Sequence, residues 1–167
     1  MKALKAVIDG LNRVILVASL TILAAMVIII IYQVFSRQIL GSAPAWSEEI
    51  SRMLFVWVSF LGISYGFREK LHIGVGLIID RLPEKVQDMF DYFAKILVIG
   101  FGVILLYYGW QFTMLTSNST MPATGLPSSV LYGVIPVTGF FVLLNGIELL
   151  FVKGMHQELE DGSEGAE

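Results

Sequence analysis

The sequence has no cysteine and few charged residues. None of its 167 residues is a cysteine, which excludes disulfides, thiolate metal sites and cysteine nucleophiles. Only 15% of the residues are charged, against about 25% in an average soluble domain, whereas 56% are hydrophobic. The chain therefore lacks the polar surface that water requires, and its composition predicts an integral membrane protein embedded in a lipid bilayer.

Residue types that carry chemistry are also scarce. The two histidines, His72 and His156, lie outside the long apolar runs, where a haem between membrane helices would need its ligands. One isolated histidine does not make a metal site, so we expect His72 to be a loop residue that is solvated or braced against a partner. Lys95 and Glu148 lie near the ends of apolar runs, where we expect them to reach toward the lipid headgroups. The sequence thus predicts a non-catalytic protein with no cofactor and no nucleic-acid partner.

Long charge-free runs predict four transmembrane helices, because about 20 apolar residues are needed to cross a bilayer and helices satisfy their own backbone hydrogen bonds. We expect the spans at about residues 14–36, 50–67, 92–115 and 130–152. The stretch TSNSTMPATGLPSS, rich in proline, glycine and hydroxyl groups, predicts the turn before the fourth span. Residues 1–152 are therefore expected to form a single all-α membrane domain, followed by a flexible acidic tail at 153–167.

Two short amphipathic segments, residues 2–13 and 83–93, precede the first and third predicted spans. Each would either lie in the membrane interface as a short helix or extend the neighbouring span, and the pattern leaves both open. Lysine and arginine gather before the first span, between the second and third, and after the fourth. By the positive-inside rule, both termini are expected in the cytoplasm.

The second span begins with an unusual concentration of charge. Its uncharged part, residues 53–67, would reach only about 22 Å at about 1.5 Å per residue, less than the roughly 30 Å of the hydrocarbon core. Ser47 is suited to cap this helix, and Glu48 and Glu49 would then lie in its first turn, where the helix dipole favours anions. Arg52 lies one turn deeper, toward the low dielectric, where an unpaired charge is costly.

Polar residues at the end of the first predicted span lie at a similar depth. Gln33 and Arg37 could join Glu49 and Arg52 in a polar cluster that links the two spans or faces another protein. Trp46 is placed as an anchor at the membrane interface. In the third span, Gly100, Gly102 and Gly109 would let another helix approach closely.

Several stretches between Gln33 and Pro83 follow one known pattern: QVFSR, then WSEEISRMLFVWVSFLGISYGFREKLHIGV, then RLP. Together with the later GLPSSVLYGVIPVTG, they resemble the small membrane subunit of tripartite ATP-independent periplasmic (TRAP) transporters, the DctQ type. One departure from the pattern is Gly76, where such sequences often carry an acidic residue.

The resemblance implies a subunit of a three-part uptake system in the bacterial inner membrane. A soluble periplasmic protein would capture an organic anion, and a large membrane subunit would carry it inward, driven by sodium ions that bind to that large subunit. The chain described here would support the large subunit as a scaffold and help to dock the soluble protein. Two other readings stay open at this point: a membrane anchor of a redox complex, and a free-standing small transporter.

Overall fold

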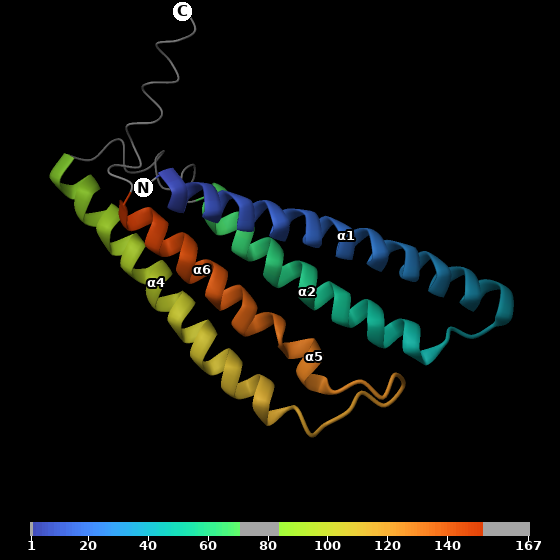
Figure 1. Ribbon diagram of the computed structural model, residues 1–167. Helices are drawn as coiled ribbons and strands as arrows, with labels where there is room; N and C mark the ends of the chain where they lie inside the picture. Colours follow the sequence, from blue (N-terminus) through green and yellow to red (C-terminus); the bar gives the residue numbers. More distant parts are fainter. Residues whose placement is uncertain (1, 71–83, 152–167) are drawn as a thin grey trace, which may run out of the picture.

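The computed structural model describes residues 2–70 and 84–151, and its elements there are helices. The first two helices, α1 (Lys2–Leu40) and α2 (Ala45–Lys70), form an antiparallel hairpin. The others are α4 (Glu84–Leu115), the short α5 (Ser128–Tyr132) and α6 (Val134–Phe151). Figure 1 shows α1, α2, α6 and α4 side by side in that order, so that α1 and α4 form the two edges.

The two ends of the molecule differ in what they carry. The start of α1 and the end of α6 lie at one end (Figure 1). The connections 41–44 and 116–127 lie at the other, which we call the loop end. Within residues 2–70 and 84–151, three helical segments are long and apolar enough to cross a membrane: Ile8–Leu40, Tyr92–Leu115 and Ser128–Leu149. Helix α2 is not among them, and its beginning carries Glu48, Glu49 and Arg52.

The two amphipathic segments are not separate helices in the described part of the chain. Residues 2–13 form the first turns of α1, and residues 84–93 form the first turns of α4, without a break in either helix. The short interfacial helices that the fold prediction included are therefore not found among these residues, and each segment extends its neighbouring span, the second of the two alternatives that the sequence left open. With 39 residues, α1 reaches about 58 Å, well beyond the roughly 30 Å of a hydrocarbon core. His72, Gly76 and the tail 153–167 lie outside the described residues.

The turn between α1 and α2 is short and has a clear local cause. Gly41 adopts a positive φ of 73°, the left-handed conformation that ends many helices. Helix α2 then begins directly after Pro44, two residues before the cap that we expected at Ser47. The hydroxyl of Ser47 donates to the carbonyl oxygen of Pro44 at 2.6 Å, so it does not cap the helix.

The fourth predicted span is confirmed as the apolar segment Ser128–Leu149, but its helix is interrupted at Gly133, between α5 and α6. Pro136 has no N–H with which to bond the carbonyl of Tyr132, four residues earlier. The hydroxyl of Thr113, on α4, lies 3.3 Å from that carbonyl oxygen, and the indole N–H of Trp57, on α2, donates to the carbonyl of Val130 at 3.0 Å. Neighbouring helices thus supply donors near the break, which matters in lipid, where no water is available.

Glycines bring α4 and α6 into close contact. A Cβ atom added at Gly102 or Gly109 of α4, or at Gly139 or Gly146 of α6, would lie 2.5–2.9 Å from an atom of the opposite helix. A Cβ at Gly100 would meet nothing within 4 Å. The prediction that glycines let a helix approach the third span is confirmed for Gly102 and Gly109 and wrong for Gly100. The glycines on each helix are seven residues apart, about two turns, so they share one face.

Candidate functional site at the loop end

The connection between α4 and α5 folds into a small hairpin. The N–H of Met121 donates to the carbonyl of Leu126 at 2.8 Å, and the N–H of Ser128 donates to the carbonyl of Ser119 at 2.7 Å. Gly125 adopts a positive φ of 70°, which allows the tight turn at the tip. The N–H groups of Ala123 and Thr124, near the tip, donate to a partner outside the hairpin.

Glu49, at the start of α2, accepts hydrogen bonds from this tip. One carboxylate oxygen accepts from the N–H of Ala123 at 2.8 Å, and the other accepts from the N–H of Thr124 at 2.8 Å and from its hydroxyl at 2.9 Å. The side chain is only 5% exposed. A buried charge is stable when its hydrogen-bonding capacity is met in this way, so Glu49 ties the start of α2 to a loop more than 70 residues away.

The contacts of Glu49 also set its ionisation. Burial raises the pKa of the carboxyl, but the hydrogen bonds from Ala123 and Thr124 and the positive charge of Arg52 lower it by more. The result is a pKa below the usual value, so Glu49 is a carboxylate at neutral pH.

The arginines that we expected beside Glu49 do not bond to it. Arg52 is exposed and acts on Glu49 through its charge, without a hydrogen bond or ion pair between the two. Arg37 and Glu48 are also exposed, and Gln33 is half-buried. The structure therefore gives Glu49 loop amides as its direct partners, and a role of these residues in holding a partner protein stays a prediction.

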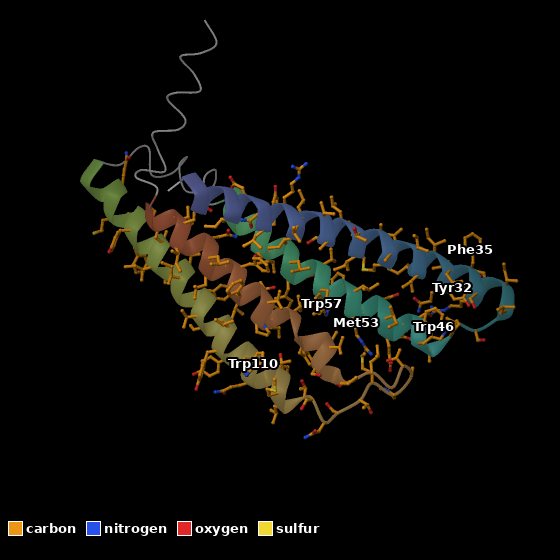
Figure 2. The ribbon with its side chains drawn as sticks, in the orientation of Figure 1. Tyr32, Phe35, Trp46, Met53, Trp57 and Trp110 are labelled. Carbon is orange, nitrogen blue, oxygen red and sulfur yellow. The ribbon has the colours of Figure 1, made fainter. Side chains whose placement is uncertain are left out.

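The predicted anchor Trp46 lies at the loop end against α1. Its ring stacks on that of Tyr32, with the centroids 5.9 Å apart and the planes 26° from parallel (Figure 2). Both residues are large, partly polar aromatics of the kind that lie at membrane interfaces. The stack joins the beginning of α2 to the end of α1 next to the Glu49 contact.

Sequence reasoning missed a second polar contact, at the opposite end of the molecule. The amides of Asn12 on α1 and Asn145 on α6 exchange hydrogen bonds of 2.9 and 3.2 Å, and the two residues are 2% and 3% exposed. Asn12 also donates to the carbonyl of Ile8. The available signal was Asn145 itself, an amide in an otherwise apolar stretch, since a polar group inside a membrane helix requires a partner.

The described residues offer no evident place for a metal ion. Among them, no group of three or more His, Cys, Asp or Glu side chains could hold one. Lys95, which we expected to extend toward the headgroups, is instead 6% exposed and so is buried against the protein. The predicted loop histidine His72 is outside the part of the chain that the structure describes.

Comparison with known proteins places the chain among transport subunits. The family model of the DctQ component of tripartite ATP-independent periplasmic transporters matches residues 26–153. The sialic acid TRAP transporter small permease protein SiaQ of Vibrio cholerae is 26% identical over 152 residues, covering 90% of this chain and 86% of that protein. The C4-dicarboxylate small permease protein DctQ of Rhodobacter capsulatus is 27% identical over 119 residues, covering 66% of this chain and 50% of that protein.

One further relative is much longer than this chain. The isethionate TRAP transporter permease protein DctMQ of Oleidesulfovibrio alaskensis is 30% identical over 122 residues, which are 68% of this chain but only 19% of that protein. There the small component is part of one polypeptide with the remainder of the permease. With the match over residues 26–153, these findings show that the chain belongs to the DctQ family, the small permease subunits of TRAP transporters, and is a membrane transport component, not an enzyme.

Proposed function

We propose that this chain is the supporting subunit of a sodium-driven uptake transporter for an organic anion, in which a separate large subunit moves the substrate. The observation that carries the proposal is the family match over residues 26–153, together with a relative in which this component is fused to a longer permease. The names of relatives indicate sialic acid and C4-dicarboxylates as substrates of those transporters. Such anions are the substrate class proposed here.

The arrangement of the helices supports a scaffold role. The helices lie in a layer, and the two edge helices, α1 and α4, expose many large apolar side chains. Lipid or another membrane protein must cover such surface, since water cannot. On the strength of the family match, we assign the sodium sites to the large subunit.

We further propose that α2 is a fourth span and that both termini face the cytoplasm of a bacterial inner membrane. Helix α2 packs along α1 and α6, which are apolar enough to cross, so it has the position of a crossing helix. Its 26 residues reach about 39 Å, which is sufficient for the hydrocarbon core when the charged first turns lie in the headgroup region. Basic residues favour the cytoplasm, which puts the loop end, with Glu49, in the periplasm.

In this orientation, the hairpin 119–128 is available to the periplasmic substrate-binding protein. Its residues carry no charge, most of them are exposed, and Glu49 fixes the backbone of the tip. A preorganised surface loses less entropy on binding than a free loop would. We assign to this hairpin a part in docking the soluble protein, alongside the large subunit.

The test is reconstitution with and without this chain. The large subunit and the soluble protein from the same organism are prepared with this chain, and sodium-driven uptake of a radiolabelled sugar acid or dicarboxylate into proteoliposomes is measured. We expect this chain to co-purify with the large subunit and uptake to require both. Uptake by this chain alone, or full uptake by the large subunit without it, would contradict the proposal.

A further inference from the structure

At the loop end, the hairpin of α1 and α2 extends farther than α4 and α6 (Figure 1). The hydroxyl of Thr113, near the end of α4, lies 3.3 Å from the carbonyl oxygen of Tyr132, and Trp57 of α2 donates to the nearby carbonyl of Val130. Helix α4 therefore ends about level with Trp57. The first part of α2, from Ala45 to Trp57, extends about 18 Å past that level, at about 1.5 Å per residue.

Polar residues at this end indicate where the hydrocarbon of the membrane stops. Glu48 and Arg52 of α2 are exposed, and so are residues 117–120, which are all polar. Glu49 bonds to the tip of the same hairpin. A charge that faces hydrocarbon is costly, so these groups belong in water or among the lipid headgroups. Helix α2 and the hairpin therefore leave the hydrocarbon at about the level of Arg52.

Helix α1 remains apolar beyond that level. The stack of Tyr32 on Trp46 fixes the register of α1 against α2, and the packing of Ile15 with Leu61 agrees with it. In this register, Arg52 lies opposite about residue 26 of α1, so the segment 28–40 projects roughly 20 Å past the charged start of α2. Because α1 runs without a break to residue 40, this segment cannot fold back onto the membrane surface.

The projecting segment carries an exposed apolar stripe. Its large side chains recur every three or four residues and therefore share one face of the helix. Their exposed fractions are 67%, 51%, 60% and 75%, and we call them the α1 stripe: Ile28, Ile31, Phe35 and Ile39. By the same periodicity, the exposed Arg37 lies on the opposite face. Figure 2 shows Phe35 on the outer side of α1, whereas Tyr32 lies toward Trp46.

Neither water nor lipid is a suitable cover for the α1 stripe. A continuous apolar surface in water is unfavourable and marks a site of interaction. Lipid would reach the stripe only if the hairpin sank into the membrane, and this would draw the exposed Glu48 and Arg52 into hydrocarbon as well. The stripe therefore requires a protein partner.

The shape of the surface favours a partner that is itself embedded in the membrane. The same face of α1 continues toward the middle of the span through Ala24 and Val17, both exposed. A soluble partner would leave the stripe uncovered each time it dissociated. A permanent membrane partner would cover the whole face, inside and outside the hydrocarbon.

We propose that the α1 stripe is a docking surface for the large permease subunit, which reaches beyond the hydrocarbon at the loop end. The inference rests on the proposed function, in which such a separate subunit moves the substrate. In the long relative from Oleidesulfovibrio alaskensis, the small component and the rest of the permease form one polypeptide, which fits a permanent contact. Phe35, in the middle of the stripe, is an aromatic side chain of the kind that anchors interfaces.

The first test is photo-cross-linking in proteoliposomes that contain this chain and the large subunit. A photoreactive phenylalanine analogue replaces either Phe35 or Leu40. Leu40 is the matched control, because it is 72% exposed in the same segment but lies on another face of the helix. We expect the large subunit to be cross-linked several-fold more efficiently from position 35 than from position 40.

Two results of this experiment have different meanings. Equal cross-linking from both positions, or cross-linking from position 35 to lipid alone, would overturn the docking proposal while the two subunits still co-purify. Failure of the chain to co-purify with the large subunit at all would overturn the proposed function itself.

The second test measures the affinity between the two purified subunits in detergent. Phe35→Gln should weaken binding about tenfold, as expected for loss of an interface anchor, whereas Leu40→Gln should leave the affinity unchanged. The Tm of each variant without the large subunit should equal that of the parent chain, because both side chains are exposed there. Equal affinities of the two variants would overturn the proposal.

Discussion

Replacing Gly139 by alanine tests the close contact between α4 and α6. The added Cβ would lie 2.5 Å from the backbone nitrogen of Leu106 and 2.8 Å from the backbone carbon of Leu105. Both atoms belong to the backbone of α4, which cannot rotate away as a flexible side chain could. An unstrained contact needs about 3.5 Å, so the two helices must separate by roughly 1 Å.

The size of the effect follows from two opposing terms. Overpacking of this kind costs about 1–3 kcal/mol, whereas alanine is favoured over glycine in a helix by up to about 1 kcal/mol. Separation of the helices also weakens the dispersion contacts at Gly102, Gly109 and Gly146, which share the same interface. We therefore expect a net loss of about 1–2 kcal/mol, which lowers the Tm by about 2–8 °C for a protein of this size.

The assay is thermal unfolding of the full-length protein in detergent, followed by tryptophan fluorescence. Gly100→Ala is the matched control, because it makes the same change in α4 at a position where the Cβ meets nothing within 4 Å. The control should keep or raise the Tm. Equal Tm values for Gly139→Ala and Gly100→Ala would refute the argument that backbone contact at Gly139 holds the two helices together.

Four further predictions concern the polar contacts. Glu49→Gln should loosen the hairpin, because a neutral amide has one oxygen for the two N–H groups that the carboxylate now serves. We expect proteolytic cleavage in the hairpin to be faster in this variant than in the control variant Glu48→Gln, which changes an exposed residue. Because folding lowers the pKa of Glu49, its stabilisation should be complete above about pH 4.3 and be lost as the pH falls further; a Tm difference from Glu49→Gln that persists unchanged at lower pH would contradict this. Asn12→Ala and Asn145→Ala should each cost about 1–2 kcal/mol and be strongly non-additive in the double variant, whereas independent losses would contradict their pairing. Trp57→Phe removes the donor to Val130 and should cost about 0.5–1.5 kcal/mol of stability, measured by chemical unfolding, and no loss would show that this bond contributes nothing.

Local signals in the sequence determined much of this protein. Charge-free runs predicted the long apolar helices near 14–36 and 92–115, because length and hydropathy act within one segment. The charged start of α2 and the turn before α5 could also be predicted, because each of these signals lies within a few consecutive residues. The family pattern between Gln33 and Pro83 predicted the transport subunit, which the comparisons confirmed.

Tertiary structure decided which residues are partners. The sequence placed Arg52 three residues from Glu49 as its obvious counter-ion, but the carboxylate bonds to Ala123 and Thr124, whose amides a hairpin presents from far along the chain. The sequence predicted a close helix approach at both Gly100 and Gly102, and only the position of α6 shows that the contact is at Gly102.

The same holds for the polar residues inside the helices. Asn12 and Asn145 are 133 positions apart, and only the register of α1 against α6 joins them. A hydropathy pattern reports how apolar a segment is and where it turns. It does not report how far one helix is shifted along another, and that shift determines every contact between them.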